Sequence, residues 1–123
     1  MSDNPQITEA ELEVMKVIWE RFPISTNDIA AELESKSRWN VRTIHTLISR
    51  LEKKGAISHI KDGRVFIYSP VVNKEEYIRS ESKTFLNKFY NGAVNKMIMN
   101  FMENDMFSAE DIEELKNILN KRK

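Results

Sequence analysis

The feature that most constrains the fold is an amphipathic stretch from Trp39 to Gly55. Its apolar side chains recur at spacings of three and four, which gathers them on one side of a helix: Val41, Ile44, Leu47, Ile48 and Leu51. Asn40 can cap the start of this helix through its side-chain oxygen, and Gly55 can end it in the left-handed conformation. The stretch therefore predicts a helix with one buried side.

The other side of this predicted helix is polar and cationic, with no carboxylate at its centre. At about 100° per residue, the side chains on it and on its two shoulders are Arg42, Thr43, His45, Thr46, Ser49, Arg50 and Lys53. A short helix with long donors and small hydroxyls fits the major groove, where it can contact bases and phosphates together. We interpret it as a recognition helix, and the alternative is an ordinary amphipathic helix with a solvated basic face.

Two further helices are predicted ahead of the cationic one. Thr8 and Glu11 form a capping-box pattern before a helix over about residues 9–21. Ser25 repeats the start signal for a short second helix that ends near Ser35. Two compact helices before a basic third helix match the order of a helix-turn-helix unit.

A β-hairpin is predicted directly after the cationic helix. The runs 57–61 and 64–68 are rich in β-branched and aromatic residues, and Asp62-Gly63 between them is typical of a type I′ turn. Lys61 and Arg64 flank the tip, from which they can reach a phosphate or a groove. Three helices followed by a hairpin predict a winged helix-turn-helix domain over residues 1–72. DNA binding is the predicted function, and use as a protein-interaction module is the alternative.

Three more helices are predicted over residues 73–123, which makes the chain mainly α. This segment is too small to bury its large apolar side chains alone, so we expect it to be a dimerisation domain. The residues expected at the dimer interface are Phe85, Leu86, Phe89, Met97, Ile98, Phe101, Ile112, Leu115, Ile118 and Leu119. A homodimer would present two recognition helices to a two-fold DNA operator. The alternatives are a tail folded back onto its own winged helix, and a tail that binds a small inducer.

Charge is unevenly distributed although the formal net charge is zero. Between residues 36 and 64 only Glu52 and Asp62 are acidic, and they face eight cations: Lys36, Arg38, Arg42, Arg50, Lys53, Lys54, Lys61 and Arg64. This cationic stretch suits a polyanionic partner such as double-stranded DNA, whereas the rest of the chain has a negative balance.

Other classes of function have little support in the composition. The chain has no cysteine and only His45 and His59, so we expect neither thiol chemistry nor a metal site. Its three glycines are all assigned to caps and turns, and no phosphate loop or nucleophile elbow occurs, so we expect no enzymatic activity and no cofactor. The polar start of the chain and the lack of a long apolar run predict a cytoplasmic protein without membrane insertion.

Several longer motifs give the chain a family resemblance. They are T-E-A-E-L-E-V-M-K-V-I-W from Thr8, V-R-T-I-H-T-L-I-S-R-L-E-K-K-G from Val41, K-T-F-L-N-K-F-Y from Lys83, and D-I-E-E-L-K-N-I-L-N-K from Asp111. With these motifs, which span nearly the whole chain, it resembles the penicillinase and methicillin-resistance repressors, the BlaI/MecI family.

The resemblance implies a homodimeric repressor on operator dyads of β-lactamase or β-lactam-resistance genes. In this family, a membrane sensor detects a β-lactam and the repressor is then cut between Asn and Phe in its tail, which matches Asn100-Phe101 here. The resemblance also assigns DNA contacts to Arg42, Thr43, Thr46 and Arg50, whereas His45 stands where the family often has Arg. The related copper-responsive repressors carry a cysteine cluster that this chain lacks, which disfavours metal induction of that type.

Overall fold

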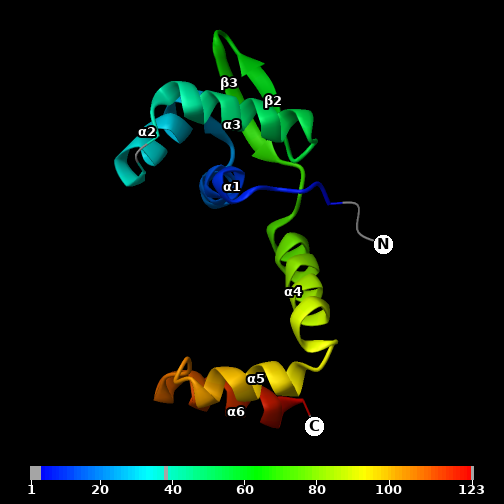
Figure 1. Ribbon diagram of the computed structural model, residues 1–123. Coiled ribbons are helices and arrows are strands. Elements are labelled where there is room, and N and C mark those ends of the chain that lie inside the picture. The colour runs from blue at the N-terminus through cyan, green and yellow to red at the C-terminus, as the bar shows by residue number, and fades with distance from the viewer. Residues whose placement is uncertain (1–3, 38, 123) are drawn as a thin grey trace. The chain divides into compact units, whose positions relative to one another are not determined.

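The computed structural model describes residues 4–37 and 39–122, so Arg38 of the cationic stretch lies outside the described residues (Figure 1). The chain divides into two compact units, Met1–Ile78 and Arg79–Lys123. This division falls inside the helix that follows the hairpin, slightly beyond the predicted boundary between residues 72 and 73. The assignment of separate functions to the two parts stays a prediction.

The first unit begins with three helices: α1 (Glu9–Arg21), α2 (Thr26–Lys36) and α3 (Val41–Lys53). Each helix starts at the residue that the sequence indicates, because a side-chain oxygen accepts a hydrogen bond from a free backbone N–H. Thr8 Oγ1 accepts from Glu11 N at 3.1 Å, and Asn40 Oδ1 accepts from Thr43 N at 2.9 Å. Ser25 caps α2 in the same way. The three predicted helices are therefore confirmed.

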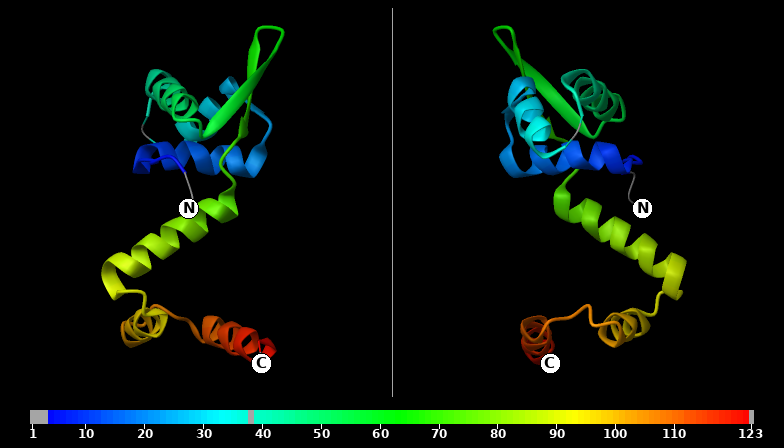
Figure 2. Two further views of the ribbon diagram at one scale, coloured as in Figure 1. Left: turned by 90° about the vertical axis from the view of Figure 1, so that its right-hand side faces the viewer. Right: turned by 60° about the vertical axis from the view of Figure 1, so that its left-hand side comes forward.

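A three-stranded antiparallel sheet completes the winged helix. Its strands are β1 (Ile24–Ser25), β2 (Ile57–Asp62) and β3 (Val65–Pro70), in the order β1-β3-β2. The predicted hairpin is confirmed, and the tip of β2–β3 extends beyond the three helices (Figure 2). The short strand β1 was not predicted, because two residues carry no periodic pattern and their strand state depends on pairing with Ile67 and Tyr68.

The hairpin turn differs from the prediction by one residue. Asp62 pairs with Val65, so the loop consists of Gly63 and Arg64 rather than Asp62 and Gly63. Gly63 has a φ of +65°, whereas neither Asp62 nor Arg64 is among the residues with positive φ. Positive φ at the first central position alone is the pattern of a type II′ turn, so the predicted type I′ turn is wrong.

The core of the first unit combines side chains from the three helices, the sheet and the start of the next helix. These are Val14, Met15, Val17, Ile18, Ile24, Ile29, Ala30, Leu33, Ile44, Leu47, Ile48, Leu51, Ala56, Ile57, Tyr68, Val72 and Tyr77. Val41 was predicted on the buried side of α3 but is 40% exposed. Val41 lies in the first turn of α3 and at the edge of the apolar stripe. The core positions of α3 are therefore taken by the other apolar residues of the stripe, Ile44, Leu47, Ile48 and Leu51.

The helix after the hairpin, α4 (Lys74–Tyr90), begins against the first unit. Trp19 Nε1 donates to the carbonyl of Val72 at 2.9 Å, and the rings of Trp19 and Tyr77 lie 5.7 Å apart. Asn73 Oδ1 accepts from Glu76 N at 3.1 Å, which confirms the predicted start of α4. The first turn of α4 is thus part of the winged-helix core.

The second unit contains the rest of α4 together with α5 (Val94–Glu103) and α6 (Ala109–Lys121). The predicted break between α4 and α5 is confirmed, since Asn91 and Gly92 have φ values of +50° and +82°. The predicted capping box of Ser108 with Asp111 is also present. No residue of α5 or α6 is fully buried, and their apolar side chains are half-buried or exposed.

Candidate nucleic-acid interface

The exposed face of α3 carries the cationic side chains that the sequence singles out. Ile44, Leu47, Ile48 and Leu51 are buried on the opposite side of the helix, which holds this face outward. The predicted contact residues are all exposed: Arg42, Thr43, His45, Thr46, Arg50 and Lys53 on α3, and Lys61 and Arg64 on the hairpin. The amphipathic pattern therefore predicted correctly which α3 side chains of this set face solvent.

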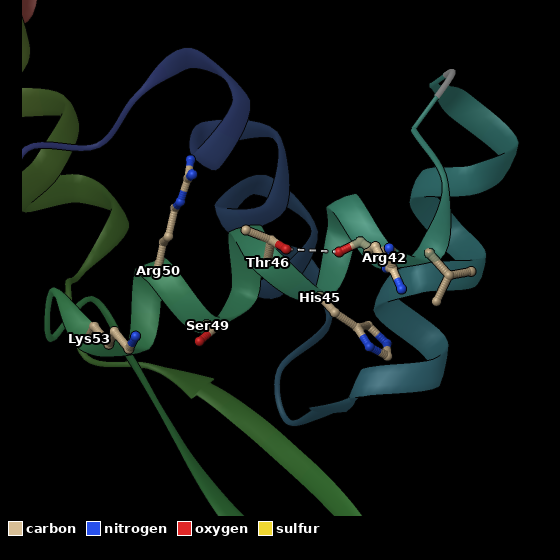
Figure 3. Close-up of a pocket in the computed structure, with 7 residues that line it drawn as sticks. Arg42, His45, Thr46, Ser49, Arg50 and Lys53 are labelled. Atoms are coloured by element: carbon tan, nitrogen blue, oxygen red, sulfur yellow. Dashed lines mark hydrogen bonds between the residues drawn. The ribbon is translucent and has the colours of Figure 1, made fainter.

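A shallow hollow of about 610 Å³ runs along this face. Its lining residues are Val41, Arg42, His45, Thr46, Ser49, Arg50 and Lys53, which project from successive turns of α3 (Figure 3). Thr43 is exposed but does not line the hollow. The sequence pattern did not predict that Val41 lines this hollow. Its position at the start of the helix and at the edge of the apolar stripe could have indicated it. The methyl groups of Val41 give the hollow an apolar edge.

The long cationic side chains of this face keep their hydrogen-bond donors available to a partner. Thr46 Oγ1 donates to the carbonyl of Arg42 at 3.0 Å, which fixes the hydroxyl and leaves its lone pairs free (Figure 3). Among the described residues, no salt bridge involves Arg42, Arg50 or Lys53. Their donors are available for phosphate oxygens or base edges.

Two other cations of the stretch are paired with carboxylates of the same unit. Lys54 Nζ lies 2.5 Å from Glu11 Oε1 and donates to the carbonyl of Gln6 at 2.7 Å. Lys36 pairs with Glu32 at 2.8 Å. The count of eight cations therefore overstates the charge that is free for a partner.

Among the described residues of the first unit, Glu11 is the buried charged side chain, with 1% of its surface exposed. Burial opposes its charged form, but the hydrogen bonds from Lys54 and Thr8 outweigh burial and lower the pKa of this carboxyl. Glu11 therefore joins the capping box of α1 to the end of α3.

The hairpin cations occupy separate positions from the hollow on α3. Lys61 Nζ lies 5.9 Å from the centre of the Phe66 ring. Arg64 lines a small hollow of about 160 Å³ with Thr26, Asn27 and Phe66. Arg64 thus lies near the start of α2, while both cations stay exposed.

The tail residues predicted to form a dimer interface are half-buried or exposed, and none is buried. Phe85, Leu86, Met97 and Phe101 from this set line a groove of about 620 Å³ within the second unit.

At the predicted cleavage site, Asn100 Nδ2 donates to the hydroxyl of Tyr90 at 2.9 Å. The carbonyl of Asn100 accepts from the backbone N–H of Asn104 at 3.2 Å and from its Nδ2 at 2.8 Å.

The structure was also searched for membrane spans and metal sites. None of the helices in residues 4–37 and 39–122 is long and apolar enough to cross a membrane. Over the same residues, no group of three or more acidic or histidine side chains is placed to hold a metal ion.

Comparison with known proteins agrees with this architecture. A solution structure of monomeric Bacillus licheniformis BlaI in complex with the blaP half-operator matches with a TM-score of 0.56 and 51% identity, over 63% of this chain and 94% of that one. The fold and the exposed cationic helix thus define a winged-helix protein of the repressor class. The chain belongs to the penicillinase repressor family, since the sequence model of that family matches residues 7–121.

Two relatives give the same assignment over nearly their full lengths. The penicillinase repressor of Bacillus licheniformis is 51% identical over 123 residues, which covers 100% of this chain and 96% of the relative. The methicillin resistance regulatory protein MecI of Staphylococcus aureus strain N315 is 43% identical over 117 residues, 95% of each chain. The sequence-based family resemblance is therefore confirmed.

Proposed function

We propose that this chain is a transcriptional repressor that binds an operator in double-stranded DNA as a homodimer and controls β-lactamase or β-lactam-resistance genes. The observation that carries the proposal is the exposed cationic face of α3, whose hollow is lined by arginine, lysine, histidine and hydroxyl side chains and by no carboxylate. Its relatives are named as penicillinase and methicillin-resistance repressors, and the structure of one of them contains a half-operator.

The residues divide into two kinds of contact. Arg42 and Arg50 carry guanidinium groups that can bind a guanine edge in a bidentate manner, and each such contact discriminates by about 1–3 kcal/mol. Lys53, Lys61 and Arg64 suit phosphate oxygens, which position the protein and make binding depend on salt. His45 stands where the family often has arginine, and its imidazole is a shorter donor than a guanidinium group. We therefore expect this position to prefer different operator bases.

Dimerisation through the second unit is supported by its exposed apolar side chains. Phe85 is 43% exposed, Phe89 61%, Ile118 53% and Leu119 60%. A stable monomer seldom leaves so many large apolar groups in water, and a second copy of the same surface would cover them. Two linked recognition helices would then bind an operator dyad at a high effective concentration.

Release of the repressor by cleavage at Asn100-Phe101 is supported by the family resemblance and by the position of this bond. Asn100 is exposed, and it lies in the last turn and a half of α5, which ends at Glu103. Cutting there would separate α6 from α4 and most of α5, and would weaken the proposed dimer. A protease linked to a membrane sensor is the partner that this step needs. That the chain acts in the cytoplasm, without enzymatic activity of its own, belongs to the same proposal.

A gel-shift titration tests the proposal. Full-length protein and a truncation after Asn100 are titrated against a β-lactamase-promoter dyad and a scrambled duplex at near-physiological salt. Tight binding to the dyad by the full-length protein alone is the expected result. Equal weak binding to both duplexes would instead favour a protein-interaction module, or a ligand-induced regulator of other genes whose ligand occupies the apolar groove of the second unit.

A further inference from the structure

A polar contact joins the wing, which is the β2–β3 hairpin, to the recognition helix α3: it lies between His59 on β2 and Glu52 on α3. Nδ1 of His59 forms a hydrogen bond with Oε2 of Glu52. Glu52 is the only carboxylate in α3, and it does not line the hollow on the cationic face. The one acidic side chain of the reading helix is thus bound on its wing side.

The ring of His59 is held in place by the second strand of the wing. His59 pairs with Tyr68 in the antiparallel register. Its ring stacks on Phe66 with centroids 4.4 Å apart and an angle of 18°, and it lies 5.4 Å from the ring of Tyr68. Burial raises the pKa of the Tyr68 phenol, and the charge of the Glu52 carboxylate raises it further.

Toward α3, little else among the described residues fixes the outer part of the hairpin; its other support comes from β1, which pairs with β3, and from the start of α2. On β2, Ile57 is buried and His59 is half-buried, while Ile60 is 69% exposed and the residues beyond it are exposed as well. Lys61 and Arg64 lie on this outer part. Because the apolar packing ends near the base of the hairpin, the contact with Glu52 is the last tie to α3 before the cationic tip.

We propose that His59 is a positioning residue for DNA binding, which fixes the cationic wing against α3 by holding Glu52. The inference rests on the proposed function and adds a residue to it. The contact does two things at once: it sets where Lys61 and Arg64 can meet the backbone, and it keeps the carboxylate of Glu52 away from phosphates. Loss of the contact loosens the wing and frees a negative charge beside the reading face.

Two substitutions separate the hydrogen bond from the ring stack. His59→Phe keeps an aromatic ring to pack on Phe66 but cannot bind Glu52. His59→Asn loses the stack but keeps an amide donor, Nδ2, at the same number of bonds from Cβ as the imidazole Nδ1. If the hydrogen bond positions the wing, His59→Asn binds the operator better than His59→Phe. If the ring only supports the hairpin, the order is reversed.

A double-mutant cycle measures the coupling directly. Operator affinity is measured by fluorescence anisotropy on the β-lactamase-promoter dyad and a scrambled duplex, at a temperature where calorimetry shows every variant folded. We expect His59→Phe to weaken dyad binding about five-fold, the size of the net contribution of one hydrogen bond. In a Glu52→Ala background the same change has almost no effect. An equal loss in both backgrounds overturns the inference. Lys16→Gln, which removes the exposed Lys16–Glu13 pair on α1, is the control and leaves dyad binding unchanged.

A second readout does not depend on the choice of operator. NMR order parameters of the wing-tip amides, from Lys61 to Arg64, are compared between the wild-type protein and His59→Phe without DNA. We expect lower order parameters in the variant, and unchanged values overturn the inference. Equal wild-type binding to both duplexes would count against the proposed function instead, so the two failures are distinguishable.

Discussion

Replacing Lys54 by methionine tests the buried charge that joins α1 to α3. The change removes the ammonium group that lies 2.5 Å from Glu11, while methionine keeps most of the length of the side chain. Breaking a fully buried ion pair costs about 3–5 kcal/mol. The side chain of Lys54 is 32% exposed, so water reaches the site, and Glu11 keeps its hydrogen bond from Thr8 at 3.0 Å. We therefore expect a loss of about 2 kcal/mol, near the middle of the range for a hydrogen bond to a charged group.

The effect must depend on pH in a defined direction. In the folded wild-type protein the pKa of Glu11 is lowered, so the pair contributes stability above the unfolded pKa of glutamate and loses it as pH falls through the folded pKa. Without Lys54, two of the causes that lower the pKa of Glu11 are lost while burial, which raises it, remains, so this pKa is higher in the variant than in the wild-type protein. The variant's deficit is therefore largest at neutral pH and shrinks as the pH falls from the pKa of Glu11 in the variant toward its lower pKa in the wild-type protein.

Scanning calorimetry at pH 7 and at acidic pH measures both quantities. For a domain of this size, about 2 kcal/mol corresponds to a Tm lower by about 10 °C at pH 7. Lys53→Met is the matched control, because the neighbouring Lys53 is exposed and takes part in none of the described salt bridges. A deficit that is the same at both pH values, or a control that loses as much, would refute the role given to Glu11.

Three further predictions concern binding and cleavage. Arg42→Ala should weaken operator binding by about 1–3 kcal/mol and leave circular dichroism unchanged; an unaltered affinity in a gel shift would exclude α3 as the reader. Phe101→Ser should weaken the dimer, and sedimentation velocity at dilute concentration would contradict this by finding an intact dimer. Asn104→Ala removes a hydrogen bond to the Asn100 carbonyl, so limited proteolysis should cut the Asn100-Phe101 bond faster than in the wild-type protein; an equal rate would argue against a protective role.

The parts of the fold that the sequence predicts are those set by neighbouring residues. Helix starts at Thr8, Asn40 and Ser108 depend on hydrogen bonds over three residues, and the pattern of α3 assigns each face by spacing alone. The hairpin turn was misplaced by one residue because Asp62-Gly63 and Gly63-Arg64 both contain the glycine that such turns require. Strand β1 was missed because its state depends on a strand far along the chain.

The candidate site was predicted where it depends on one helix and missed where it depends on two elements. Arg42 and Thr46 follow from the α3 pattern. The ion pair between Lys54 and Glu11 joins residues that are 43 positions apart, and no local sequence pattern indicates it. The contact between Glu52 and His59 spans only seven positions, yet it requires the turn from α3 into β2 to bring them together.

The packing of Trp19 gives the two units separate optical reporters. The chain has two tryptophans, Trp19 and Trp39, and both pack against the core of the first unit. Indole emission therefore reports the melting of the winged helix, whereas far-ultraviolet dichroism reports the helices of both units. If the second unit is a dimer interface, raising the protein concentration shifts its part of the dichroism curve to higher temperature. If the emission melting curve shifts to higher temperature as well, dimerisation stabilises the winged helix in addition to pairing two copies of it.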